Sequence, residues 1–460
     1  MMRKLQLINV KFTLKSILNK KLMTTPQYRQ LSMALVFSLT TLLCACTEID
    51  KKPTKPFDTL NKIAEQYVKL GLELGQYDKD YVDAYLGPKE WQKKAQQQTR
   101  SKQQLGADIS ELLKTLQTID VTQQDLKLRH KALFRNLRAM DVRARMLLGE
   151  TFSFAEEAQL IYDANIIQYD FKKFDRTLSA IEKLVPGEGD LAKRVNTFRK
   201  HFAVANENVS DVVNLAIAEC KKRSDRYISL PTNERFDLEY VTEKSWSGYN
   251  WYQGDNKSLM QINQDFPMQI DRAIGLGCHE GYPGHHVWNV LIENNLLTKN
   301  DWIEFSIFPL FSPYALIAEG SANYGVDLAF PGNQKLIYER DILFPLAGLA
   351  PARAEVLDNL NHLINKLSHA ITATAQLYLN GEISRNEAIE QRRKYSLISQ
   401  AKAEQSVRFI EQYRAYVLNY NVGKDIVSDY INEQSQDEAG KWRAFESMLT
   451  ELSTASDMTK

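Results

Sequence analysis

The sequence predicts a mainly α-helical protein with a small β-sheet. Glycine and proline account for only 20 and 13 of the 460 residues, below the averages of about 7% and 5%, and such a chain favours long helices with few turns. Apolar residues recur at helical spacing through most of the chain. One aromatic-rich stretch, 240–262, alternates instead, and it precedes a cluster of histidines at 279–286. We therefore expect a helical fold in which the sheet lies next to the helix that carries this cluster.

The charge balance excludes a basic nucleic-acid-binding surface. Lys and Arg number 58 against 57 Asp and Glu, which gives a net charge of +1. Hydrophobic residues make up 44% and charged residues 25%, an ordinary composition for a globular protein. Binding to a phosphate backbone requires a concentration of Lys and Arg that this composition does not offer. We expect no nucleic-acid partner.

The first 45 residues have the pattern of a signal peptide. No acidic residue precedes Glu48, and seven Lys or Arg side chains lie before an apolar run at 31–43. This run is shorter than the roughly 20 residues that a membrane-spanning helix needs. A basic head followed by a short apolar middle is typical of a bacterial secretory signal, and Met23 is a candidate for the true start. An uncleaved anchor is the alternative.

The end of this segment predicts lipid attachment. Leu43-Cys44-Ala45-Cys46 resembles a lipobox, so we expect cleavage after residue 45 and a lipid on Cys46, with 46–57 as a tether. The expected location is the cell envelope, facing the periplasm. Thr47 at the position after the cysteine favours the outer membrane.

Helical periodicity defines an N-terminal part, 58–230. Asp58 is placed to cap a first helix, whose apolar residues recur at three- and four-residue intervals through 60–72. Other segments of this kind are 109–116, 133–148 and 191–226, and a turn is expected at 185–189.

The second part, 231–460, begins with the strongest strand signal in the chain. Aromatic alternation around Asp255-Asn256 predicts a β-hairpin. Its first strand, within 246–254, is either structural or an edge strand that binds an extended peptide, with Tyr249 as the candidate contact. Helical periodicity resumes after Pro267 and continues to the C-terminus.

The histidine cluster reads His279-Glu280-Gly281-Tyr282-Pro283-Gly284-His285-His286. In the zinc motif H-E-x-x-H, the two histidines lie four residues apart on one helix face. Here that position is a proline, and a straight helix would place His285 about 9 Å along the axis and about 120° round from His279. Two nitrogens on one zinc lie only about 3.3 Å apart. A shared metal therefore requires a break in the helix, which Pro283-Gly284 can provide.

Two alternatives remain open for this cluster. His286 lies about 20° off His279 on a straight helix, although about 10.5 Å along it. It is therefore an alternative second ligand, or a substrate contact. The histidines could also be ordinary residues with satisfied hydrogen bonds.

Glu319 is the candidate third ligand. It lies in the apolar stretch 315–324, where a carboxylate needs a partner because its burial alone is costly. Zn²⁺ would be that partner, and Glu280 would then act as the base that activates a zinc-bound water. A helix-surface carboxylate is the alternative for Glu319.

These motifs resemble those of a known bacterial protein family. His-Glu-x-x-Pro-Gly-His-His, followed by Glu319-Gly320-x-Ala-x-Tyr, resembles the bacterial domain-of-unknown-function family 885, which is grouped with the gluzincin metallopeptidases. The resemblance implies a helical zinc-metallopeptidase-like fold, zinc ligands at His279, His285 and Glu319, and Glu280 as base. The segment 417–423 is also similar to the family, and implies that Tyr420 reaches the site as an oxyanion donor. A core or surface position is the alternative for Tyr420, and it is the position expected for Tyr413 and Tyr416. The chain departs from the family at residue 321, where Ser replaces the usual Trp.

Other residues give less specific signals. Arg408 and Arg414 could hold a substrate carboxylate, or could form ordinary ion pairs. With Cys44 in the signal and Cys46 carrying the lipid, Cys220 and Cys278 are the cysteines of the folded body, and the sequence leaves their pairing open.

The combined expectation is a lipid-anchored, zinc-dependent hydrolase that acts on peptides or small amides. The alternative is a non-catalytic envelope lipoprotein that keeps a structural or partner-binding metal site. A carboxylate-pair glycosidase is a third hypothesis. Substrate identity, exo or endo action and oligomeric state are not determined by the sequence.

Overall fold

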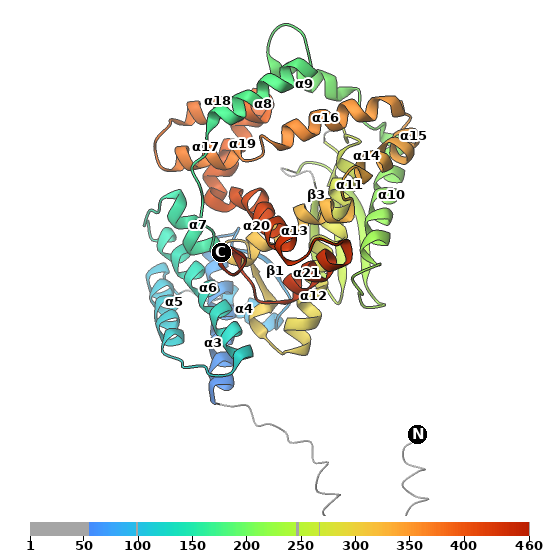
Figure 1. Ribbon diagram of the computed structural model, residues 1–460. Helices are drawn as coiled ribbons and strands as arrows, with labels where there is room; N and C mark the ends of the chain where they lie inside the picture. Colours follow the sequence, from blue (N-terminus) through green and yellow to red (C-terminus); the bar gives the residue numbers. More distant parts are fainter. Residues whose placement is uncertain (1–54, 98–99, 245–247, 266, 460) are drawn as a thin grey trace, which may run out of the picture. The chain divides into compact units, whose positions relative to one another are not determined.

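The computed structural model describes residues 55–97, 100–244, 248–265 and 267–459 (Figure 1). Residues Lys55–Lys460 form one compact unit. The chain is mainly helical, with 68% helix and small sheets, which confirms the predicted class. The expected signal peptide and the lipidated Cys46 lie outside the described residues. None of the described helices is sufficiently long and apolar to cross a membrane.

The first half of the compact unit is a set of packed helices. Their bounds are α3 (Lys55–Tyr77), α4 (Lys89–Gln97), α5 (Lys102–Gln117), α6 (Gln124–Leu147), α7 (Phe154–Tyr162), α8 (Phe171–Leu184), α9 (Leu191–Lys200) and α10 (Asn206–Ser224). Because α3 begins at Lys55, the expected tether ends three residues earlier than predicted. Asp58 lies in the first turn of α3, where its charge complements the helix dipole.

The connection between α8 and α9 is the predicted turn, with Gly187 and Gly189 at positive φ. The single helix expected over 191–226 is instead divided into α9 and α10. Between them the backbone pairs with another segment: Ala203 forms a β-bridge with Gln269, and Val204 N–H donates to the carbonyl of Met268. This tertiary pairing outweighs the local helical periodicity.

The predicted hairpin forms β3 (Gly248–Gly254) and β4 (Lys257–Asn263). Asp255 and Asn256 both have positive φ, as a two-residue hairpin turn with the favoured twist requires. A third strand, β2 (Arg235–Val241), pairs in parallel with β4 and was not predicted. The order β2-β4-β3 leaves β3 at an edge. A separate two-stranded sheet pairs β1 (Val82–Tyr85) with β5 (Ile307–Pro309).

The remaining chain is helical and includes several π- and 3₁₀-helical turns. The elements are α11 (Arg272–Leu276), η1 (Gly277–Gly281), α12 (His285–Ile292), η2 (Glu293–Lys299), η3 (Ile303–Ser306), α13 (Pro313–Ala329), α14 (Gln334–Tyr338), η4 (Glu339–Leu343), α15 (Phe344–Leu346), η5 (Pro351–Arg353), α16 (Ala354–Asn365), α17 (Ala370–Leu379), α18 (Arg385–Ser396), α19 (Gln400–Tyr413), η6 (Arg414–Tyr420), α20 (Val422–Gln434), α21 (Glu438–Thr450) and α22 (Ala455–Met458). The expected division near residue 230 falls inside the compact unit, between α10 and β2.

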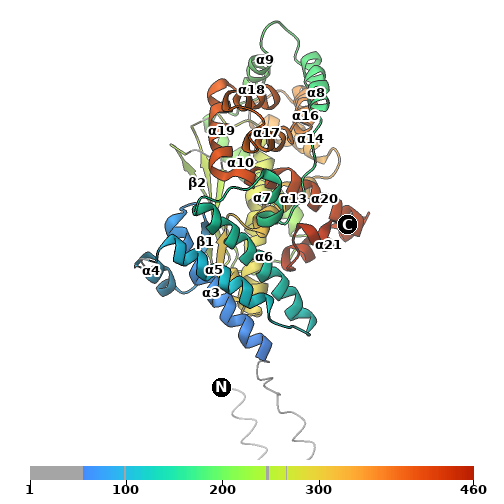
Figure 2. The ribbon, with the colours of Figure 1, turned by 90° about the vertical axis from the view of Figure 1, so that its left-hand side faces the viewer.

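Helix α13 forms the centre of this half, and α20 packs directly against it (Figures 1 and 2). A Cβ atom on Gly320 would lie 2.5 Å from the carbonyl carbon of Gly423, so the two backbones meet at these glycines. On the same helix, a Cβ on Gly325 would lie 2.9 Å from Cγ of Pro283. The Glu-Gly motif, the C-terminal Tyr-x-x-Gly segment and the proline of the histidine cluster therefore pack together.

Candidate metal centre

The histidine cluster breaks the helix that contains it. α11 continues into the π-helical turn η1, after which Tyr282 N–H donates to Gly277 and Gly284 N–H donates to Cys278. The Tyr282–Pro283 peptide bond is cis, and α12 begins at His285. A Cβ on Gly284 would lie 1.8 Å from the carbonyl oxygen of His279, so only glycine fits there. The backbone thus turns back on itself between the two histidines.

This turn brings His279 and His285 together, with Glu319 of α13 beside them. Oε2 of Glu319 lies 3.5 Å from Nε2 of His279 and 3.7 Å from Nε2 of His285. The two imidazole rings are perpendicular, with centroids 4.7 Å apart. One donor atom from each of the three residues lies within 4.8 Å of the others. These are the three side chains that the sequence indicated as ligands.

The three side chains fit a divalent metal ion. Oε2 of Glu319 is buried and has no hydrogen-bond partner among the described residues. Its distances to the two imidazole nitrogens are long for hydrogen bonds. They are close to the roughly 3.3 Å that separates two light ligand atoms on one tetrahedral zinc. Two imidazoles and a carboxylate are also a donor set found in catalytic zinc sites.

Electrostatics within the trio favour a charged pair when no metal is bound. Burial would raise the pKa of Glu319, but the contacts with His279 and His285 outweigh it and hold that pKa well below its usual value. Burial would lower the pKa of His285, but its contact with Glu319 and the charges of Glu319, Glu280 and Asp83 raise it to about 9. The metal-free trio at neutral pH therefore holds a proton on His285 beside an ionised Glu319.

Zinc binding should consequently be coupled to proton release. Zinc requires the neutral imidazole, so below the pKa of about 9 of His285 it must displace a proton. We expect the apparent association constant to rise about tenfold per pH unit between neutral pH and that pKa, and then to level off. Calorimetric titration in buffers of different ionisation enthalpy measures the released proton. An affinity that does not change over this range would contradict the assignment of the proton to His285.

Two tyrosines of η6 lie next to the trio. The hydroxyl of Tyr416 donates to Oε1 of Glu319 at 2.9 Å, which leaves Oε2 directed at the imidazoles. The ring of Tyr420 lies edge-on to that of Tyr416, with centroids 5.7 Å apart. Desolvation and the charge of Glu319 raise the pKa of Tyr420, so its hydroxyl keeps its proton at neutral pH. Tyr420 was predicted at the site, whereas Tyr416 was expected in the core or at the surface; its spacing from Tyr420 is the only sequence signal.

Glu280 is buried in η1 between the trio and the edge strand. The side-chain amide of Asn250 donates to the backbone carbonyl oxygen of Glu280 at 2.6 Å. A Cβ on Gly248 would lie 3.7 Å from Oε1 of Glu280, so β3 passes directly over the carboxylate. The negative charge of Glu280 acts on His285. Glu280 therefore neighbours the trio without being one of its members.

Asp83 of β1 is a site residue that sequence reasoning missed. The hydroxyl of Tyr249, on β3, donates to Oδ1 of Asp83 at 3.1 Å. The charges of His285, Glu319 and Glu280 all act on Asp83. Tyr249, predicted as a substrate contact, thus reaches the site beside a carboxylate from a distant part of the chain. Nothing in the sequence around residue 83 indicates this role.

His286 is not brought to the trio. Its ring is fully buried, with Nδ1 2.8 Å from Oγ of Ser258 and Nε2 2.8 Å from Oε1 of Glu234. Burial lowers its pKa, against the opposing effect of Glu234. Because both ring nitrogens have partners and no surface is exposed, neither the alternative ligand role nor substrate contact fits this position. His285 is the histidine that lies beside His279 and Glu319.

The two arginines are also placed away from the trio. Arg408 is exposed on α19, where its charge acts on Glu411. Nε of Arg414 donates to Oε1 of Glu157 at 2.6 Å. Arg414 therefore follows the ion-pair alternative, and the expected substrate-binding role of Arg408 has no geometric support.

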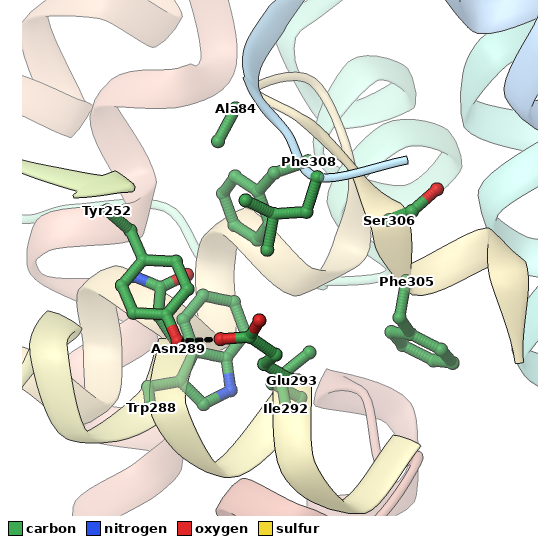
Figure 3. Close-up of a pocket in the computed structure, with 10 residues that line it drawn as sticks. Ala84, Tyr252, Trp288, Asn289, Ile292, Glu293, Phe305, Ser306 and Phe308 are labelled. Atoms are coloured by element: carbon green, nitrogen blue, oxygen red, sulfur yellow. Dashed lines mark hydrogen bonds between the residues drawn. The ribbon is translucent and has the colours of Figure 1, made fainter. Parts of the chain in front are cut away.

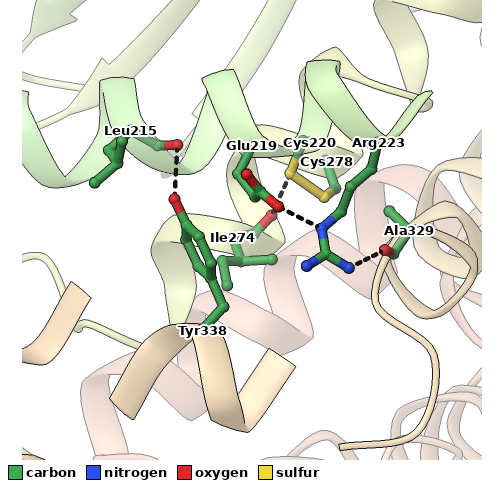
Figure 4. Close-up of a disulfide and its surroundings, with 8 residues drawn as sticks. All are labelled: Leu215, Glu219, Cys220, Arg223, Ile274, Cys278, Ala329 and Tyr338. Atoms are coloured by element: carbon green, nitrogen blue, oxygen red, sulfur yellow. Dashed lines mark hydrogen bonds and ion pairs between the residues drawn. A yellow bond between two sulfur atoms is a disulfide. The ribbon is translucent and has the colours of Figure 1, made fainter. Parts of the chain in front are cut away.

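Cys220 and Cys278 form a disulfide, a point that the sequence left open (Figure 4). The bond joins α10 to η1, immediately before His279. Arg223, one turn further along α10, pairs with Glu219 and donates to the carbonyl of Ala329 at the end of α13. Helix α10 thus contacts two of the three elements that supply the trio, η1 with His279 and α13 with Glu319.

Removal of this disulfide should lower stability. The cysteines are 58 residues apart, and a loop of that size corresponds to about 4 kcal/mol in the chain-entropy description. We expect the free energy of unfolding of the Cys220→Ser, Cys278→Ser double variant to fall by this amount. Urea denaturation of the variant and the wild type, both without reductant, measures the difference. Equal unfolding midpoints for the variant and the wild type would contradict this role.

A small cavity lies beside α12 and is lined in part by Trp288 and Ile292 of that helix (Figure 3). Its lining includes Ala84, Tyr252, Trp288 and Phe308, and the hydroxyl of Tyr252 bonds to Glu293 at its edge. The volume of about 20 Å³ is room for about one water molecule. It is therefore not a substrate pocket.

Comparisons with known proteins are limited to weak structural similarity. No protein-family model and no curated protein matches the chain. A protein described as a lipoprotein from Colwellia psychrerythraea is similar with a TM-score of 0.47 and 13% identity, over 76% of this chain and 69% of that one. A lipoprotein of unknown function from Shewanella oneidensis has a TM-score of 0.41 and 14% identity, over 76% and 73%. A protein called BsuCP has a TM-score of 0.41 and 11% identity, over 85% and 88%. Similarity at this level assigns neither family nor activity.

Proposed function

We propose that the protein is a zinc-dependent hydrolase of peptide or related amide bonds, held in the cell envelope by a lipid on Cys46. One observation carries the proposal: a buried, unpartnered oxygen of Glu319 faces two imidazole nitrogens at 3.5 and 3.7 Å, and Glu280 lies beside them. The resemblance of these motifs to the domain-of-unknown-function family 885 supports it. The proposed fold is accordingly that of a helical zinc metallopeptidase.

The roles of the residues follow from their positions. His279, His285 and Glu319 would hold zinc, which supplies Lewis acidity when bound and lowers the pKa of water. Glu280 would accept a proton from the attacking water and deliver it to the leaving nitrogen. Tyr420, which stays protonated at neutral pH, would donate a hydrogen bond to the developing oxyanion.

The edge strand β3 offers a place for the substrate backbone. One side of β3 pairs with β4, and no described strand pairs with its other side. Gly248 and Asn250 contact Glu280, so an extended chain added to this edge would pass the carboxylate. Trp251 on the same strand is 50% exposed and could contact a substrate side chain.

The proposal is tested with the 47–460 fragment and a peptide library. We expect cleavage with zinc present, loss of cleavage after treatment with a chelator, and recovery when zinc is restored. A fragment that binds zinc and cleaves no peptide would instead support the alternative of a non-catalytic envelope lipoprotein. The buried Glu280 argues against that alternative, because a structural zinc site needs no base.

A further inference from the structure

A buried hydrogen-bond network lies beside the break in the histidine cluster. Oε1 of Glu234, the residue before β2, accepts a hydrogen bond from the hydroxyl of Tyr282 and lies 2.8 Å from Nε2 of His286. Tyr282 lies before Pro283-Gly284 and His286 lies after it, so one oxygen atom joins the two sides of the break. The side chain of Glu234 is 8% exposed, Tyr282 is 2% exposed and His286 is fully buried. These polar groups therefore depend on one another for their hydrogen bonds.

The donors and acceptors of this network are defined by the charge of Glu234. Burial would raise the pKa of Glu234, but hydrogen bonds from His286 and Tyr282 lower it to about 2. An ionised carboxylate only accepts hydrogen bonds, so Nε2 of His286 carries a proton. Nδ1 of the same ring lies 2.8 Å from Oγ of Ser258 on β4. On the other side of the carboxylate, Lys221 of α10 pairs with Oε2 of Glu234 at 3.1 Å.

Ser258, His286 and Glu234 have the residue types of a nucleophilic triad. Ser258 is only 1% exposed, however, so its hydroxyl is not placed to attack a substrate. Its contact with Nδ1 instead fixes the orientation of the imidazole ring. The network therefore holds His286 in place.

Holding His286 also fixes the direction of His285. Both histidines lie in the first turn of α12, and successive residues of an α-helix project about 100° apart. The ring of His286 is held at both nitrogens, and Phe236 of β2 packs against His286 and Tyr282 with ring centroids 5.2 and 5.5 Å apart. The rotation of α12 about its axis is therefore set by contacts with a sheet that carries no member of the trio.

We propose that Glu234 is a positioning residue of the candidate metal centre. By joining Tyr282 to His286 across the break, its Oε1 atom sets the direction in which α12 presents His285. The zinc affinity of the trio then depends on Glu234, which is not itself a ligand. This inference rests on the proposed function, because it concerns the same zinc site.

The test compares Glu234→Met with Glu234→Gln in the full chain. The two new side chains have nearly the same length, but only glutamine keeps an oxygen that accepts from Tyr282 and His286. We expect the zinc affinity of Glu234→Met to be about tenfold or more below that of the wild type, as for other residues that hold metal ligands in place. Glu234→Gln should restore the affinity to within about threefold of the wild type. Competition with a chromophoric chelator measures the affinity of each protein.

Cobalt(II) in place of zinc provides a second measurement on the same variants. Its visible absorption bands depend on the geometry of the ligands. We expect them to change in position or intensity in Glu234→Met and to match the wild type in Glu234→Gln. A general loss of stability does not change these bands while the protein remains folded, which circular dichroism checks.

Glu73→Met is the matched control. The side chain of Glu73 is 9% exposed and pairs with Arg100 at 3.2 Å, so the same substitution removes a similarly buried and paired carboxylate. Glu73 lies on α3, which carries no member of the trio. Its replacement should leave both the zinc affinity and the cobalt spectrum at wild-type values.

Wild-type zinc affinity or a wild-type cobalt spectrum in Glu234→Met would overturn the proposal, as would an equal loss of affinity in Glu234→Gln or in Glu73→Met. If Glu234→Met does not fold, Tyr282→Phe replaces it, because this change removes only one donor to Oε1. It should lower the zinc affinity about two- to tenfold, and an unchanged affinity would then overturn the proposal. A wild type that binds no zinc would overturn the proposed function together with this inference, whereas a failure confined to the Glu234 variants would overturn this inference alone.

Discussion

Replacing Glu280 with glutamine is expected to abolish turnover while zinc remains bound. Glutamine preserves the size of the side chain and leaves His279, His285 and Glu319 intact, so the ligand set is unchanged. It cannot accept a proton from water or return one to the leaving nitrogen. General acid–base groups of this kind contribute about 10²–10⁴-fold to the rate, and we expect a loss of that order in kcat. Peptide cleavage and metal analysis of the same preparation measure the two quantities.

A matched control for this variant is Glu239→Gln. Glu239 is an exposed residue of β2 that accepts a hydrogen bond from Gln261. Its replacement should leave both turnover and zinc content at the wild-type level. Loss of zinc from Glu280→Gln would show that Glu280 is a ligand and that the assignment of base and ligand is wrong. Full turnover in that variant would remove Glu280 from the reaction.

Replacing Gly284 with alanine is expected to separate the two imidazoles. The added Cβ would lie 1.8 Å from the carbonyl oxygen and 2.4 Å from the carbonyl carbon of His279. Both are backbone atoms, so no side-chain movement relieves the clash, and the turn between His279 and His285 must open. Overpacking typically costs about 1–3 kcal/mol. We expect destabilisation of at least that order together with a large loss of zinc affinity.

Gly275→Ala provides the control within the same helical run. A Cβ at this position of α11 meets no atom within 4 Å. Alanine in a helix also restricts the unfolded chain, so the change should stabilise the protein by about 0.4–1 kcal/mol. Urea denaturation and competition with a chromophoric chelator measure both variants. If Gly284→Ala bound zinc as tightly as Gly275→Ala, the turn would not be what assembles the trio.

The need for this turn could be predicted from the sequence, but its form could not. A regular helix cannot bring His279 and His285 to one ion, and Pro283-Gly284 between them can break the helix. The π-helical hydrogen bonds of η1 depend on packing against α10 and α13, which no local pattern describes. The choice between His285 and His286 depends on Ser258 of β4 and on Glu234, the residue before β2, which bond to the two ring nitrogens of His286.

The strands β1, β2 and β5 were not predicted, for two different reasons. β2 was missed although Phe236, Leu238 and Tyr240 alternate with charged residues, so a period of two was present in the sequence. β1 and β5 have only four and three residues, too few to show any period. Asp83 belongs to one of these short strands and reaches Tyr249 only through tertiary contacts, so its position could not be predicted from the local sequence.

The central claim is that the trio binds a metal ion, and metal content measures this most directly. Inductively coupled plasma mass spectrometry should find about one zinc per chain in the wild type after zinc loading and dialysis, as a three-ligand catalytic site implies. The His279→Ala variant, prepared in parallel and shown to be folded by circular dichroism, should retain almost none. A wild type that holds no zinc, or a His279→Ala variant that keeps a full equivalent, would contradict the account.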